Sequence, residues 1–158
     1  MAEFQTKVGA PKPGLPGQIP IGSQDPIVTD TDYWSDGTLN PGDFAFAASD
    51  EGPNANIASK TGNHLLGIVV RSSGSYCAGA IIPIAVSGAI YVDVPEYQTP
   101  SSGQAVLCDP VTGEVTYGKA GDPNDTGWDV QLLPRQFNVQ GGDMVIYKRL
   151  GSRTSHKS

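Results

Sequence analysis

The chain has 158 residues, which suits one ordinary domain with tails and is too short for two independent domains. Glycine (20) and proline (13) supply about a fifth of the residues, where average usage gives about an eighth. This excludes a helical bundle or a coiled coil. Only 16% of the residues are charged, and the excess of small and turn-forming residues predicts short strands joined by many turns.

Charge is distributed unevenly along the chain. Residues 1–24 carry +1, residues 25–143 carry 15 acidic and 4 basic residues for a net −11, and residues 144–158 carry +4. Because an acidic body repels phosphate backbones, we expect no nucleic-acid partner. Residues 151–158 are predicted to form a flexible basic tail.

Residues 1–26 differ in composition from the rest of the chain. Five prolines and four glycines interrupt any helix or ladder strand there, which predicts an extended N-terminal arm. The arm nevertheless carries apolar side chains at intervals. One interpretation is a flexible leader without function, and the other is an arm that becomes ordered on another protein or on another copy of the chain. In the second case the candidate anchors are Phe4, Val8, Leu15, Ile19 and Ile21.

Strand signals recur from about residue 27, so residues 27–150 are predicted to form one all-β domain, a compact β-sandwich or barrel of seven to ten short strands. Apolar runs or alternating patterns mark the expected strands, and the Pro110–Gly113 turn joins two of them as a hairpin. Any helix should be one short piece near 53–59. The expected strands are 43–47, 65–70, 86–94, 104–108, 114–117, 130–133 and 144–150.

The sequence offers little for catalysis. The only histidines are His64 and His156, and neither cysteine lies in a nucleophile elbow. Two cysteines and one internal histidine cannot complete a structural zinc site, and we expect Cys77 and Cys108 to be buried free thiols. Paired carboxylates of glycosidase type stay open, because their separation depends on the fold. We therefore name no catalytic residue, no cofactor and no metal.

Two acidic segments and one apolar segment are interpreted structurally. The run 30–37 fails as a calcium loop because Trp34 occupies a position that needs an oxygen ligand, and 122–125 is read as a tight turn. The uncharged stretch 78–92 is too short for a membrane span and contains proline, so no membrane partner is expected. The N-terminus has no apolar signal core, which favours synthesis in a host cytoplasm.

One enzyme alternative has a concrete shape. Gly88, Ile90 and Asp93 resemble the segment that holds the catalytic aspartate of small trimeric all-β dUTP pyrophosphatases. The glycine-rich phosphate-binding tail of those enzymes, with a phenylalanine between glycines, is absent from 141–158. This alternative is therefore the weaker one.

The order of segments resembles the capsid cement, or decoration, proteins of tailed bacteriophages. The resemblance rests on spacing and glycine placement over most of the chain rather than on one motif. It is carried by Gly14–Gln18, Gly42–Phe46, Leu65–Arg71, the paired strands Gly88–Val94 and Gly103–Cys108 with their hairpin at Gly113, and the closing Gln136–Leu150.

The resemblance implies a structural protein and not an enzyme. Members of that family bind the outer surface of the head, bridge neighbouring copies of the major capsid protein, and help the shell resist the pressure of packaged DNA. The implied partners are the major capsid protein and further copies of the chain, with a homotrimer favoured over a homodimer. The competing function is a receptor- or carbohydrate-binding module of a fibre or spike, which would expose aromatic residues. Tyr33, Trp34 and Trp128 are the candidates, although packing in the core or a hinge is the favoured interpretation.

Overall fold

The computed structural model describes residues 14–20, 28–48, 56–72 and 74–149. Within these ranges it contains nine strands and no helix, which confirms the all-β class. The strands are β1 (Val28–Ser35), β2 (Phe44–Ala47), β3 (Ile57–Ser59), β4 (His64–Val69), β5 (Ile81–Asp93), β6 (Ala105–Cys108), β7 (Val115–Gly118), β8 (Asp125–Gln131) and β9 (Met144–Arg149).

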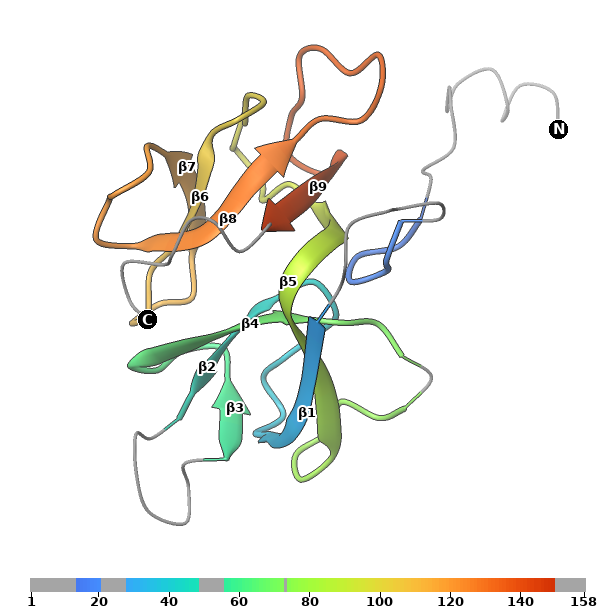
Figure 1. Cartoon of the computed structure of the whole chain (residues 1–158), viewed down its shortest axis with the longest axis vertical. Helices are drawn as coiled ribbons and strands as arrows, with labels where there is room; N and C mark the ends of the chain where they lie inside the picture. Colours follow the sequence, from blue (N-terminus) through green and yellow to red (C-terminus); the bar gives the residue numbers. More distant parts are fainter. Residues whose placement is uncertain (1–13, 21–27, 49–55, 73, 150–158) are drawn as a thin grey trace, which may run out of the picture.

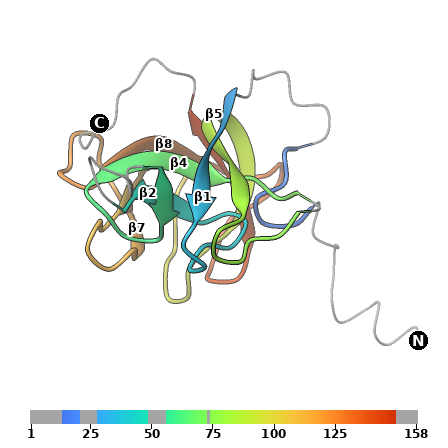
Figure 2. The ribbon, with the colours of Figure 1, turned by 90° about the horizontal axis from the view of Figure 1, so that it is seen from below.

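Five strands close into a barrel, and the other four join one barrel strand, β5, in a second sheet beside it (Figure 1). The barrel runs β1-β3-β2-β4-β5 and closes because β1 also pairs with β5. The second sheet runs β5-β9-β8-β6-β7. The 13-residue strand β5 belongs to both: residues 81–87 pair with barrel strands, and residues 88–93 pair with β9. Figure 2 looks from the barrel side, with β1 running beside β5.

The barrel interior is filled by small and aliphatic side chains, because a five-strand barrel encloses little space. Strand β2, Phe-Ala-Phe-Ala, illustrates the sorting. Its alanines, Ala45 and Ala47, face the barrel interior, and its phenylalanines face the second sheet. The interior cluster comprises Leu39, Ala45, Ala47, Ala58, Leu66, Val69, Ile82 and Ile84.

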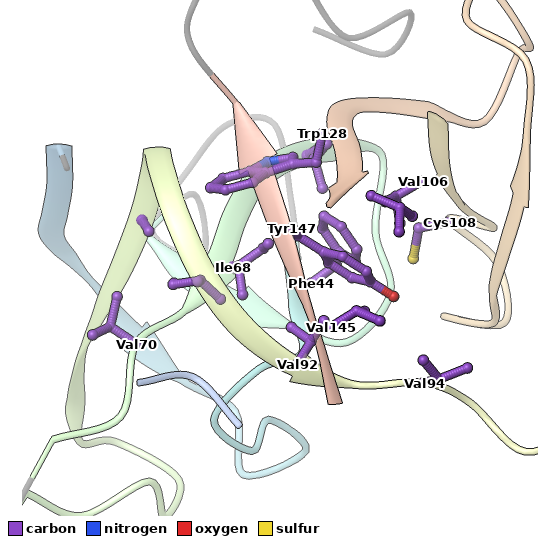
Figure 3. Close-up of a cluster of buried hydrophobic side chains, with 14 of the residues drawn as sticks. Phe44, Ile68, Val70, Val92, Val94, Val106, Cys108, Trp128, Val145 and Tyr147 are labelled. Carbon is purple, nitrogen blue, oxygen red and sulfur yellow. The ribbon is translucent and has the colours of Figure 1, made fainter. Parts of the chain in front are cut away.

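A larger core with four aromatic side chains lies between the barrel wall and the second sheet (Figure 3). Trp128 is fully buried in it, and the rings of Phe44 and Tyr147 stack with their centroids 5.9 Å apart. Burial of these side chains stabilises the packing of the two layers against each other. Each fully buried large apolar residue contributes roughly 1.5–3 kcal/mol to the folding free energy.

Several local expectations need correction. The helix expected near 53–59 is wrong over 57–59, which form β3 because these residues pair with β1 and β2. Strand β1 covers acidic residues interpreted above only as a failed calcium loop, and β8 begins at Asp125 rather than at 130. Both cysteines are free thiols, but Cys77 is exposed and only Cys108 is buried.

Candidate functional site

A short part of the N-terminal arm is fixed on the body. The Gly17 amide donates to the Tyr91 carbonyl (2.7 Å), and the Tyr91 amide donates to the Gln18 carbonyl (3.0 Å). On the other side, Arg71 donates its backbone amide to the Gly17 carbonyl (2.8 Å) and its Nε to the Pro16 carbonyl (2.9 Å). The arm segment 14–20 therefore joins the end of β4 to the second half of β5.

Gly17 makes this close approach feasible. Its φ is +81°, in the region that favours glycine. A Cβ there would lie 2.8 Å from the Pro41 Cβ and 2.9 Å from the Gly42 amide nitrogen. The Gly-Leu-Pro-Gly-Gln step of the sequence is thus a turn shaped to lie on the body.

The two candidate anchors in the arm segment keep exposed side chains. Leu15 is 54% exposed and Ile19 is 38% exposed. The hydrogen bonds to the domain involve the backbone of Pro16, Gly17 and Gln18, which lie between them. The other candidate anchors, Phe4, Val8 and Ile21, lie outside the described residues.

A second apolar surface lies on the barrel. Trp34 of β1 pairs in register with Ile57 of β3 on one side and with Ile81 of β5 on the other. Trp34 is 52% exposed, Ile81 is 61% exposed and Ile57 is half-buried. The interpretation of both tryptophans as packing residues therefore holds for Trp128 and is wrong for Trp34, whose indole is half in solvent.

A third surface lies on two loops of the second sheet, at the end far from β1 (Figure 1). Tyr97 and Phe137 are 91% and 79% exposed. Their loops touch, because a Cβ at Gly141 would lie only 2.8 Å from the Glu96 Cα. Tyr97 has a φ of 67°, an uncommon conformation for a residue with a side chain. Both aromatic side chains are thus exposed on loops that touch each other.

A cleft of about 270 Å³, lined by both charged and apolar side chains, opens between β2, β5 and the β6–β7 hairpin. Burial raises the pKa of Asp43, which lines the cleft, and the Asn40 amide and Lys60 oppose this shift. Nearby, burial raises the pKa of the Cys108 thiol to about 12, with the carboxylates of Asp109 and Asp43 adding to it. A thiol with so high a pKa is a poor nucleophile at neutral pH.

The described residues offer little support for metal or nucleophile chemistry. They contain no group of three or more His, Cys, Asp or Glu side chains placed to hold a metal ion. His64 is exposed at the first residue of β4, and Cys77 is exposed in the loop before β5. The features that stand out are therefore contact surfaces.

The described residues contain no candidate for a membrane-spanning helix. Among the residues with described structure, no helical segment has the length and apolarity needed to cross a bilayer.

The closed barrel, the second sheet and the outward apolar side chains define an all-β structural module built for contact. Comparison with known proteins gives the family. The model of a family described as "Structural cement protein (E217 gp24/Pam3 gp6)" matches residues 4–146. The chain therefore belongs to this family of phage structural cement proteins. This confirms the resemblance noted in the sequence.

A solved structure supports the fold. A chain in "The capsid of Myoviridae Phage XM1" superposes with a TM-score of 0.60 at 12% sequence identity, covering 91% of this chain and 94% of that chain. At this identity the likeness concerns the fold alone. No curated protein matches the chain.

Sequence analysis named Trp34 as a candidate exposed aromatic residue but favoured packing, and it did not predict the surface that Trp34 forms with Ile57 and Ile81. Its signal was present, since an apolar tryptophan sits between aspartates at 32 and 36. The acidic residues drew attention to cation binding instead, and the partners Ile57 and Ile81 are 23 and 47 residues away in the sequence.

Proposed function

We propose that this protein binds the outer surface of a phage head, bridges neighbouring subunits of the major capsid protein, and stabilises the shell against the pressure of packaged DNA. Membership of the structural cement family supports a capsid partner. The protein acts by binding and not by catalysis in this proposal, in line with the buried, protonated Cys108 and the exposed His64.

One observation carries the proposal: the arm segment 14–20 is attached to the body through its backbone while Leu15 and Ile19 stay exposed. Fixing the backbone beforehand lowers the entropic cost of binding, since these residues are ordered before the partner arrives. The exposed side chains are then free to enter apolar grooves between capsid subunits. In this proposal Phe4, Val8 and Ile21 are further anchors of the same N-terminal arm.

The test uses expanded heads that lack the protein, mixed with purified variants and sedimented. We expect Leu15→Ser combined with Ile19→Ser to lower occupancy markedly, because two apolar contacts are lost. Val111→Ser is the matched control, because Val111 is 80% exposed on the β6–β7 turn. Undiminished occupancy of the double variant would sink the proposed role of the arm.

Stabilisation needs its own measurement. We expect DNA-filled heads carrying the protein to release their DNA at a higher temperature than bare heads, as detected by a DNA-binding dye. Equal release temperatures at full occupancy would leave a bound protein that does not stabilise, contrary to the proposal.

Self-association is also proposed, as a homotrimer in preference to a homodimer. A trimer would place three arm segments around one axis and engage several subunits at once, which multiplies weak contacts. Light scattering on the purified protein at micromolar concentration tests this, with three times the 16.5 kDa chain mass expected. A monomeric mass contradicts self-association, and a dimeric mass selects the alternative.

A further inference from the structure

The row of Ile57, Trp34 and Ile81 is a continuous apolar surface on the outside of the barrel. Residues that pair directly across neighbouring strands project to the same face of the sheet. The next residues along, Ser35, Ala58 and Ile82, are buried, so alternation directs the first three outward. We call this row of three side chains the Trp34 face. The β1 strand that carries it is visible at the barrel end of the molecule (Figure 2).

The surroundings of the Trp34 face are acidic. Asp32 lies two residues before Trp34 and is exposed, and Asp36 lies two residues after Trp34 and is partly exposed. Asp30 pairs with the buried Ile84 beyond a bulge in β1, so it belongs to the other face of the strand. Strands β1, β3 and β5, which supply the face, contain no lysine or arginine. An indole face with carboxylates beside it attracts a cation both through the ring quadrupole and through Coulomb interaction.

This charge pattern separates the candidate occupants. A second copy that docked through the same face would bring like charges together, which costs several kcal/mol in an interface. The remainder of the body is acidic as well, with 15 acidic and 4 basic residues in 25–143. A basic segment with aliphatic side chains complements both features. Tryptophan is also among the residue types most enriched at interface positions that dominate binding.

We infer that the Trp34 face is a second docking surface, distinct from the arm, and that its occupant is a lysine- or arginine-bearing segment of the capsid shell. The inference rests on the proposed function for its partner. Ile57 and Ile81 pack beside the aliphatic part of the basic side chain, the indole contacts its charged group, and Asp32 and Asp36 neutralise it. Strand β1, which carries Trp34, lies at the opposite end of the molecule from the loops that follow β5 and β8 (Figure 1).

The experiment measures binding of purified variants to expanded heads lacking the protein, over a series of salt concentrations. We expect Trp34→Ala to weaken binding by about tenfold, as for a central interface residue. Asp32→Asn with Asp36→Asn should weaken binding several-fold at low salt and flatten its salt dependence, because exposed charge attraction is screened. The amide introduced by Asp36→Asn keeps an oxygen that can accept from the backbone amide of Thr38, which donates to the Asp36 carboxylate at 2.9 Å in the wild type.

Val111→Ala is the control, because it removes an apolar side chain that is 80% exposed and belongs to none of the three contact surfaces. We expect its binding to equal that of the wild type. Circular dichroism checks that each variant folds, and the aspartate pair gives an answer even where Trp34→Ala does not fold. Wild-type failure to bind heads would contradict the proposed function itself.

Three outcomes overturn the inference while leaving the proposed function in place. In the first, wild type and the Trp34 and aspartate variants bind equally. In the second, the aspartate pair binds more weakly but with an unchanged salt dependence. In the third, Trp34→Ala lowers the mass measured by light scattering, which would make the face a contact between copies of the chain.

Discussion

The barrel and the second sheet share β5, but the two cores differ in the size of the side chains that fill them. The barrel interior holds three alanines and five larger aliphatic residues, whereas the core between barrel and second sheet holds Phe44, Phe46, Trp128 and Tyr147. The small space inside a narrow barrel limits the size of the side chains that fit there. The wider gap between two layers needs large side chains to fill it without cavities. The barrel should therefore be broken by adding atoms, and the layered core by removing them.

The largest expected effect comes from removing bulk at the centre of the layered core. Trp128 is fully buried, so Trp128→Ala should lower the free energy of unfolding by about 3–5 kcal/mol. Urea unfolding followed by circular dichroism measures this. Trp34→Ala is the control: its side chain is 52% exposed, and a loss below about 1 kcal/mol is expected. Similar losses for both variants would contradict the contrast between the two tryptophans.

Adding one methyl group should damage the barrel. A Cβ at Gly67 of β4 would fall on the Ala85 carbonyl oxygen and lie 2.9 Å from its carbonyl carbon. Since these atoms belong to the neighbouring backbone, Gly67→Ala should cost about 1–3 kcal/mol in unfolding free energy. Gly74→Ala is the matched control, as its nearest neighbour is the Ser72 Oγ at 3.5 Å. A neutral Gly67→Ala would show that the barrel wall yields.

Alkaline pH should act on the second sheet. Burial raises the pKa of Tyr117 to about 12 and that of Tyr147 well above 10, and their hydroxyls share a 2.6 Å hydrogen bond. A raised pKa in the folded state means that stability is complete below pH 10, where the unfolded phenol is still protonated, and is lost as pH rises toward 12.

The expected loss is about 1 kcal/mol per phenol for each pH unit above 10, and so about 2 kcal/mol for the pair. Urea unfolding at pH 9, 10 and 11 measures it, and Tyr117→Phe should lose less over this range because one titrating phenol is gone. Equal pH profiles for the wild type and this variant would argue against the assignment to Tyr117.

The smallest effect concerns the arm segment, which links the barrel side to the second sheet. Arg71→Ala removes the hydrogen bond from Nε to the Pro16 carbonyl and should cost up to about 1 kcal/mol, since this bond is exposed. Limited proteolysis within residues 14–20 should become faster while global unfolding changes little. Lys119→Ala, an exposed basic residue after β7, is the control. Unchanged cleavage would mean that the backbone bonds of Gly17 suffice.

Strands with strong local patterns were predictable from the sequence. The alternation in 86–94, the Pro110–Gly113 turn and the apolar start of 144–150 predict the second half of β5, the β6–β7 hairpin and β9. Strand β1 was harder, because its aspartates have low strand propensity and favour turns. Strand β3 has only three residues, and both strands are stabilised by pairing partners far away in the chain.

The role of the candidate anchors stays a prediction. Apolar residues in a proline-rich arm suggested outward contact, and Leu15 and Ile19 are exposed. The docking of 14–20 on the protein's own body was not predictable, because it depends on the Tyr91 backbone groups that β5 presents at the edge of the second sheet. Edge groups of that kind exist only once the sheet has formed.

The sequence by itself determined the all-β class, the acidic body and the alternation that sorts side chains between the two faces of each strand, because these follow from composition and from the period of two. Only the tertiary structure decided that β1 closes a barrel against β5 and that Trp34 faces solvent while Trp128 is buried. The physical reason is that exposure is set by which strands pair and in which register, and these contacts join residues distant in the sequence.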